Sequence, residues 1–467
     1  MRKHRTGVLV CLIVLLAVAA FAPSAAAQCT AQSSWFSNPS IPSDVNLSTG
    51  NVDCAFQQFS WQSFIALAQS NTFMSYMPSQ GVFVASGSQP LKWGQQPQIP
   101  ASCGSGATML LTQIDKTDPD SAILEAQDVQ PLVDLNGNWV HYGIQMNQTA
   151  YNYLVNCSLW QAACYNNAGA NIAFPWTATN PQGNSVVIKT AWKVLAGSDN
   201  PANFITAKAA VSPAGPTNPN CATVTVGLVG MHITQRTPTQ AEWIWATFEH
   251  VNNDPPCTSL STPPPLGGSW SFYKSNCSGS YCTTNTYFNP CSGNTSLCPT
   301  TSGPNQFCAA CTQAGIPTQV CAVNPTGADT SGNIQALNTS VQGLAPAGSL
   351  LKNYKLVGTE WTADGTATGT ISGSTLLANS VAETYVQTSD SCFSCHRSTF
   401  KPYPPSSPTS TSSADFSHLF DALDPSTANS CNPITPPSGY ACPSVTGTAS
   451  TNKHLLKIPQ QAPGSKK

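Results

Sequence analysis

Cysteine is the residue type that most constrains how this chain can fold. The sequence has 467 residues, and 19 of them are cysteines. Whether such residues form disulfides depends on the compartment, and the first residues predict export. Residues 2–5 are basic, residues 8–22 are apolar and residues 25–27 are alanines. We therefore expect a secretory signal peptide over residues 1–27, with an apolar run too short to favour a membrane anchor.

An exported chain can oxidise its cysteines, so a disulfide framework is predicted. Cys11 leaves with the signal peptide, and Cys392 and Cys395 belong to a separate motif, which leaves sixteen cysteines and up to eight disulfides. The connectivity does not follow from sequence, but short-range pairs are reasonable candidates. These candidates are Cys157 with Cys164 and Cys431 with Cys442. Zinc is disfavoured, because the chain lacks paired C-x-x-C knuckles and the compartment is oxidising.

One short segment carries its own chemistry, since residues 392–396 read C-x-x-C-H. This spacing is typical of covalent haem attachment, because two thiols on a tight turn can each add to one vinyl group of the same porphyrin. His396 follows at a position from which its imidazole can bind the iron. The alternative is a disulfide beside an idle histidine, because Cys308 and Cys311 have the same spacing without a following histidine.

At these residues the chain resembles the c-type cytochromes. The resemblance implies one covalent haem c, held by Cys392 and Cys395, with His396 as the proximal ligand of the iron. It covers the attachment motif only. In the small soluble cytochromes the motif lies early and a methionine ligand follows it, whereas here the motif lies late and no methionine follows. The resemblance therefore does not supply the second ligand.

Several residues are candidates for that second position. His232 is the first, although a lone histidine in the middle of an apolar strand is more often a hydrogen-bonded core residue. His418 lies near the motif in sequence. Met231 points to the opposite face from His232, where methionine usually fills a core. His250 ends a strand beside a polar loop and is expected at the surface. A position without any protein ligand is an equal alternative.

The second ligand separates three functions. Two strong protein ligands suit one-electron transfer, which is the function we predict. An open position would admit peroxide or oxygen and suits a peroxidase or oxygenase. Arg236 and Glu249 could assist such an enzyme, although a surface position for Arg236 and a strand position for Glu249 are the simpler expectations. A surface or assembly protein with a secondary haem is the third alternative.

The composition limits the partners. Charged residues are 8% of the sequence and the net charge is −2. Such a chain offers no basic surface to nucleic acid, and it does not support docking by strong electrostatic steering. The expected partners are redox donors and acceptors, either proteins or small molecules, which the sequence does not identify. No later segment is apolar enough to span a bilayer, so we expect a periplasmic or extracellular protein without a membrane span in the mature chain.

Hydrophobic periodicity predicts an α+β fold with a strand-rich body and packed helices. Helices are predicted over residues 53–69 and 375–387, and Asn147 is expected to cap a further short helix. The predicted strands cover residues 139–146, 186–195, 222–234, 242–251 and 350–361. In the predicted strand over residues 222–234, unbroken alternation would put five side-chain positions on a common face. These positions are Val224, Val226, Leu228, Gly230 and His232.

The chain divides into four predicted parts. They are the signal peptide (1–27), a strand-rich body with helices (28–251), a disulfide-stapled insertion rich in cysteine, proline and serine (252–330), and a closing strand with the C-terminal haem c segment (331–467).

Overall fold

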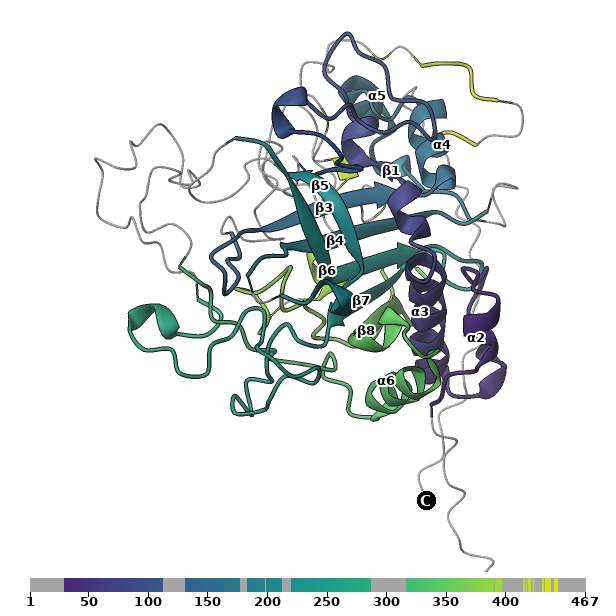
Figure 1. The fold of residues 1–467 in the computed structure, drawn as a ribbon. Helices are drawn as coiled ribbons and strands as arrows, with labels where there is room; N and C mark the ends of the chain where they lie inside the picture. The colour runs from purple at the N-terminus through teal and green to yellow at the C-terminus, as the bar shows by residue number, and fades with distance from the viewer. Residues whose placement is uncertain are drawn as a thin grey trace, which may run out of the picture.

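In the computed structural model, a nine-stranded sheet runs through the molecule, with helices packed on it (Figure 1). The residues described are 29–111, 131–176, 183–197, 199–211, 220–286, 316–366, 368–389 and 391–396, with 415, 417, 419, 420, 423, 431, 433–437 and 441–443. The predicted signal peptide lies outside them. The fold is α+β, as predicted. None of the described helices has the length and apolar character needed to cross a membrane.

The sheet is antiparallel except where β2 pairs with β5. Its order is β1-β3-β4-β6-β7-β8-β9, and β5 joins the far end of the long strand β6. All five predicted strands are present. The strands are β1 (Met77–Pro78), β2 (Met109–Leu111), β3 (Val140–Met146), β4 (Val186–Val194), β5 (Thr206–Val211), β6 (Ala222–Gln235), β7 (Ile244–His250), β8 (Tyr354–Thr362) and β9 (Ile371–Gly373).

The α-helices are short, apart from α3 and α6. They are α2 (Ser34–Ser37), α3 (Val52–Ala68), α4 (Gln148–Asn156), α5 (Ala162–Ala168), α6 (Asn333–Leu344) and α7 (Cys392–His396). The 3-10 helices are η1 (Leu47–Thr49), η2 (Thr72–Ser75), η3 (Ser79–Gly81), η4 (Ala101–Cys103), η5 (Gly169–Asn171), η6 (Pro201–Asn203), η7 (Ser280–Cys282) and η8 (Leu350–Asn353). The prediction that Asn147 caps a helix is confirmed, since its side chain accepts a hydrogen bond from the Ala150 N–H at the start of α4.

The central strands have two different faces. On the face that we call the pocket face, Lys189, His232 and Thr247 lie opposite one another in a row across β4, β6 and β7. The adjacent row on the same face is Val187, Thr234, Trp245 and Glu360. Side chains alternate along a strand, so the residues between these rows point to the other side, which we call the helix face.

The helix face is covered by α3 and α6. The ring of Phe64 on α3 stacks on Phe248 of β7, with centroids 4.3 Å apart. Asn338 on α6 accepts a hydrogen bond of 2.9 Å from Trp61 Nε1 on α3. Figure 1 shows the two helices side by side next to the sheet. This packing confirms the predicted helix over residues 53–69 and leaves the pocket face to be covered by other segments.

The predicted alternation in β6 is broken by a β-bulge. Ala191 of β4 pairs with Gly230, but the next residue, Trp192, pairs with Leu228, so Val229 is skipped. An extra residue in one strand shifts every side chain beyond it to the other face. Leu228 and Val226 therefore pack in the same core as Met231, and they do not share the face of Gly230 and His232.

Six disulfides join twelve of the described cysteines. They are Cys29–Cys54, Cys103–Cys221, Cys157–Cys442, Cys164–Cys431, Cys257–Cys321 and Cys277–Cys282. The predicted pairs Cys157–Cys164 and Cys431–Cys442 are wrong. The fold brings residues 431–442 alongside α4 and α5, with Cα–Cα distances of 5.3 and 4.7 Å for the two long-range pairs, and closeness in space decides pairing.

The helix predicted over residues 375–387 is also wrong, because this segment forms a series of turns. Only a few backbone hydrogen bonds form within it, and several of its polar groups are bonded to side chains instead. Asn379 Oδ1 accepts from the Val381 N–H at 3.0 Å, and the Ser380 hydroxyl donates to Asp254 at 2.7 Å. Local bonds of this kind compete with helix formation. The segment covers the pocket face, where Tyr142 donates to the Val381 carbonyl oxygen at 2.8 Å.

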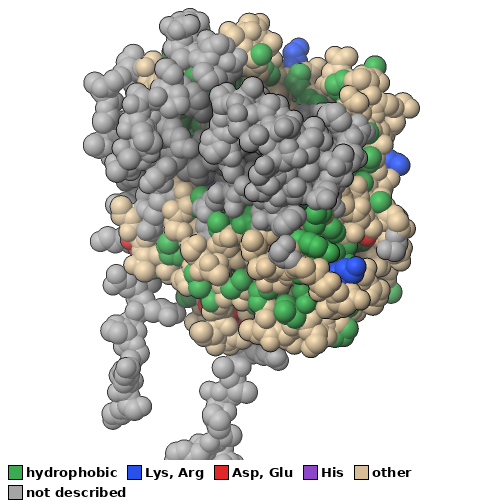
Figure 2. All heavy atoms as spheres, turned by 90° about the vertical axis from the view of Figure 1, so that its left-hand side faces the viewer, with side chains coloured by type: hydrophobic (Ala, Val, Ile, Leu, Met, Phe, Trp, Pro, Cys, Tyr) green, Lys and Arg blue, Asp and Glu red, His purple; other side chains and the backbone are tan. Residues whose placement is uncertain are grey.

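Charge is sparse on the molecular surface. In the view of Figure 2, the described part of one face is mostly uncharged, with few lysine, arginine, aspartate or glutamate side chains. This agrees with a sequence in which 8% of residues are charged. The charged residues that form the ion pairs of the fold are mostly buried.

Candidate functional site

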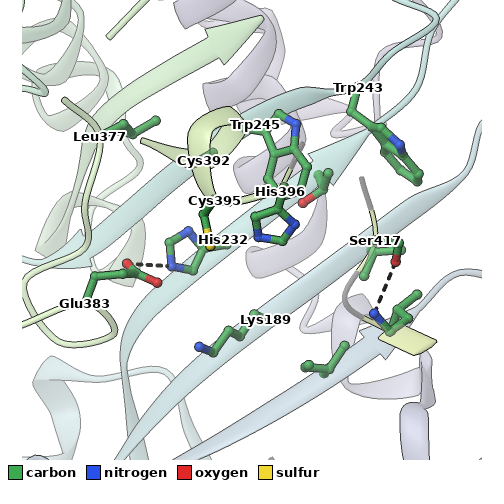
Figure 3. A pocket seen from close by; sticks show the side chains of 14 residues that line it. Lys189, His232, Trp243, Trp245, Leu377, Glu383, Cys392, Cys395, His396 and Ser417 are labelled. Carbon is green, nitrogen blue, oxygen red and sulfur yellow. Dashed lines mark hydrogen bonds and ion pairs between the residues drawn. The ribbon is translucent and has the colours of Figure 1, made fainter. Parts of the chain in front are cut away.

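A pocket lies over the pocket face and is bounded by α7 and by residues 417 and 419 (Figure 3). It encloses an empty volume of about 730 Å³, which includes open solvent. The lining residues are Ile144, Val187, Lys189, His232, Thr234, Trp243, Trp245, Leu377, Glu383, Cys392, Cys395, His396, Ser417 and Leu419. The predicted site residues Cys392, Cys395, His396 and His232 are therefore brought together.

The two motif cysteines differ from the other described cysteines. Cys392 and Cys395 remain as thiols and are partly exposed, whereas the other described cysteines form disulfides. They are three residues apart on α7, so they lie on one side of a single helical turn. Both line the pocket. This arrangement fits a ligand that reacts with two neighbouring thiols.

His396 ends α7 and is mostly buried, with 9% of its surface exposed. Its ring contacts the indole of Trp245 on β7, with centroids 4.2 Å apart and an interplanar angle of 53°. The Phe393 ring contacts the same indole edge to face, with centroids 6.0 Å apart. The Trp245 side chain therefore supports both the histidine and the interior of the motif.

His232 reaches the pocket from the middle of β6. Its Nδ1 lies 2.8 Å from the hydroxyl oxygen of Thr247, its partner in the neighbouring strand. Its Nε2 lies 3.2 Å from Glu383 Oε2, although the two atoms are not aligned as a hydrogen bond. Figure 3 shows the His232 and His396 rings within the same pocket, with Glu383 beside His232. A second imidazole is thus oriented toward the pocket by a hydrogen bond to its other nitrogen.

The remaining lining is largely apolar and includes one cation. Ile144, Val187, Leu377 and Leu419 contribute aliphatic side chains. Lys189 is mostly buried, and its Nζ lies 5.0 Å from the centre of the Tyr142 ring. Such a pocket, apolar with a few polar groups, is suited to a mostly apolar ligand that also carries polar or charged groups.

The other ligand candidates lie elsewhere. Met231 packs in the core on the helix face. His250 is buried, which corrects the predicted surface position. Its ring stacks on Phe204 at 4.3 Å, and burial lowers its pKa to about 4. His418 lies outside the described residues.

Arg236 was predicted at the surface, but this prediction is wrong, because only 2% of its surface is exposed. Its guanidinium pairs with Asp415 and lies 4.4 Å from the centre of the Trp176 ring. The carbonyl oxygen of Asp415 accepts from Trp243 Nε1 at 2.9 Å. These contacts fix the chain at residue 415, two residues before the pocket wall at Ser417.

Three pocket-related residues were not singled out in the sequence. Lys189, Glu360 and Glu383 are charged, and all three are largely buried. A signal existed for two of them, because Lys189 and Glu360 are charged residues within strands that are largely buried. A buried charge needs a partner or a function, so a charged residue inside such a strand deserves notice. Glu383 gave no such signal, because it falls in the segment predicted as an amphipathic helix.

Comparison with known proteins gives no relative: no family model, no curated protein and no solved structure matches this chain.

Proposed function

We propose that the protein carries one covalently attached haem c in this pocket and transfers single electrons in an oxidising compartment outside the cytoplasm. The observation that carries the proposal is the convergence of two thiols and two imidazoles on one apolar pocket. Cys392, Cys395 and His396 come from α7, and His232 comes from the central strand of the sheet. The six disulfides support an oxidising location.

The thiol state of Cys392 and Cys395 matters for attachment. Each sulfur would form a bond to one vinyl carbon, and the thiol proton would go to the other carbon of that vinyl group. No oxidant is consumed, but both sulfurs must be reduced before the reaction. In the described part of the chain, no three histidine, cysteine, aspartate or glutamate side chains are grouped to hold a metal ion by themselves. The donors of this pocket therefore suit an iron held in a macrocycle better than a bare ion.

Each histidine has a proposed role. His396 would bind the iron from α7, and His232 would bind it through Nε2 from the sheet. The contact between Thr247 and Nδ1 supports this role for His232, because a ligand histidine usually has its second nitrogen fixed by a hydrogen bond. Glu383 would give up its contact with Nε2. Bound haem supplies a reversible one-electron couple, which two strong ligands tune for electron transfer.

The test is an absorption spectrum of protein produced in a bacterial host that attaches haem c. The denatured pyridine adduct should report one covalent haem per chain, and its absence would end the proposal. In the native ferrous protein we expect a low-spin spectrum that carbon monoxide leaves unchanged. His232→Ala should keep the covalent haem and gain carbon monoxide binding. The control Met231→Leu, one residue away on the helix face, should keep the original spectrum.

The pairing of the His232 and Glu383 side chains, whose Nε2 and Oε2 atoms lie 3.2 Å apart, favours one other function. With the pair intact, His232 would not bind the iron, and the two side chains could hold and deliver a proton beside an open position. The protein would then be a haem enzyme of the peroxidase or oxygenase type. A high-spin native spectrum that shifts with carbon monoxide, together with peroxide turnover that Glu383→Gln reduces at least tenfold, would support this function over electron transfer.

A further inference from the structure

We propose that Glu360, on strand β8, is a positioning residue that fixes the attachment turn so that both thiols and the imidazole of His396 face the pocket. The inference rests on the proposed haem attachment and adds a residue that the motif does not contain. Glu360 has 0% of its surface exposed, and it lies on the pocket face directly opposite Trp245 in the neighbouring strand.

The carboxylate of Glu360 is bonded to the start of α7. Its Oε2 accepts from the Phe393 N–H at 3.1 Å and from the Ser391 hydroxyl at 3.2 Å. The Ser391 oxygen in turn accepts from the Ser394 N–H at 3.3 Å. Two amides of the first helical turn are thus satisfied by side chains, one of them belonging to the sheet. The amides of a first turn have no partner within the helix itself, so these bonds decide where the helix begins and how it is rotated.

The other end of α7 is held by the partner of Glu360 across the strands. Trp245 contacts the rings of Phe393 and His396. A helix of five residues cannot maintain itself, because its nucleation is costly and few intrahelical hydrogen bonds form. Two neighbouring side chains of the sheet therefore help to fix its position: the Glu360 carboxylate at its first turn, and the Trp245 indole against Phe393 and His396.

A glutamate suits this position for a specific reason. Removing it would leave the Phe393 N–H buried without its acceptor, and a buried donor without a partner is costly. A glutamine could still accept the same hydrogen bond through its Oε1. The acceptor position, and not the charge alone, is therefore expected to fix the turn. If the turn rotates, the two sulfurs no longer reach both vinyl groups, and attachment through one cysteine should replace attachment through two.

The experiment compares covalent attachment in Glu360→Ala, Glu360→Gln and the wild type, with Glu249→Ala as control. Glu249 is also a buried glutamate that accepts from a backbone amide over the pocket face, that of Ser380, but it does not contact α7. The readouts are the mass of the haem peptide and the pyridine spectrum, whose reduced band moves to longer wavelength when one vinyl group stays unreacted. A general loss of stability would lower the yield but would not change the number of bonds per haem.

We expect at least half of the haem in Glu360→Ala to be attached through one cysteine, while Glu360→Gln and Glu249→Ala keep two bonds. Complete double attachment in Glu360→Ala would overturn the inference. If that variant does not fold, Glu360→Asp decides, because it withdraws the acceptor by one methylene. Mixed attachment is expected there, and complete double attachment would again overturn the inference. A wild type without covalent haem would instead refute the proposed function itself.

Discussion

Among single residues, burial affects acidic and basic side chains in opposite ways. Burial lowers the pKa values of His141 and His250 to about 4, because both rings are held away from water. Burial, followed by the charge of Glu249, raises the pKa of Asp254 to about 7, and Lys355 and the Ser380 hydroxyl only partly oppose this. The histidines contribute stability above pH 6.5 that is lost as the pH falls toward 4. The aspartate contributes stability at low pH.

The sign for Asp254 can be tested directly. Its pKa is higher in the folded state than the ordinary 3.8, so its stabilising effect is complete below about pH 4 and is lost as the pH rises through 7. Asp254→Asn keeps a partner for Ser380 but cannot ionise. We expect the free energy of unfolding of the variant, relative to that of the wild type, to be higher at pH 8 than at pH 5 by on the order of 1–4 kcal/mol. Urea unfolding at both pH values measures this, and a constant difference would contradict it.

The hydrogen bond between His232 and Thr247 leads to a second prediction about a single residue. Thr247→Val removes the hydroxyl that lies 2.8 Å from Nδ1 and preserves the shape of the side chain. Loss of such a partner typically weakens a metal–histidine bond by about 10- to 100-fold. We expect the variant to keep covalent haem but to bind carbon monoxide partially in the ferrous state. Titration with carbon monoxide checks this, and a spectrum as inert as that of the wild type would argue against His232 as a ligand.

At the scale of elements, the pocket depends on how closely the turn segment approaches the sheet. Two strand residues without side chains permit this approach. A Cβ atom at Gly230 would lie 2.9 Å from a methyl group of Val381, and one at Gly358 would lie 2.1 Å from the Ser374 hydroxyl oxygen. Leu377 and Glu383, which line the pocket, belong to the same segment. The position of two pocket residues therefore depends on glycines in β6 and β8.

Gly358→Ala should push this segment away from the sheet. Overpacking of this kind costs about 1–3 kcal/mol, and the displaced segment should admit solvent to the pocket. Thermal unfolding measures the first effect, and the rate at which external ligands reach the haem measures the second. The control is Gly343→Ala on α6, where nothing lies within 4 Å of the added Cβ. It should be neutral or stabilise by about 1 kcal/mol. Equal effects of the two substitutions would refute the steric explanation.

At the scale of the whole molecule, two disulfides connect α4 and α5 to the C-terminal part of the chain. Cys157–Cys442 and Cys164–Cys431 close loops with sequence separations of 285 and 267 residues. These loops contain both the attachment motif and residues 417 and 419 of the pocket wall. Arg236 and Trp243 hold the same region through Asp415. The wall of the pocket is thus fixed to the body at several points that are distant in sequence.

The contributions of Cys157–Cys442 and Cys164–Cys431 to the free energy of unfolding should not be additive. While Cys157–Cys442 is present, Cys164–Cys431 closes only a ring of about 20 residues, so removing it alone should cost about 3 kcal/mol. Once both are absent, the second long loop is also released, and the combined cost should be about 9 kcal/mol in the chain-entropy model. Urea unfolding of the two paired cysteine-to-serine variants and of the quadruple variant checks this. A combined cost equal to the sum of the two separate costs would contradict it.

The sequence alone determined the features that depend on local chemistry. The spacing of Cys392, Cys395 and His396 predicted which residues would share one turn, because three and four residues are close to one helical repeat. Apolar periodicity predicted the strands and the helix α3, and Asn147 was identified as a cap because its side chain bonds to its own neighbours. These features need no knowledge of distant residues.

Only the tertiary structure decided the features that depend on contacts between residues far apart in the sequence. The partners of Cys157 and Cys164 lie more than 260 residues away, and spacing says nothing about such distances. The β-bulge at Val229 moved the side chains of Leu228 and Val226 to the opposite face of the sheet from the one predicted, because side chains alternate with a period of two. The turns at residues 375–387 replaced a helix, because Glu249 and Asp254 of other segments took its polar groups. His232 met the attachment turn through strand register, which fixes neighbours that no local pattern contains.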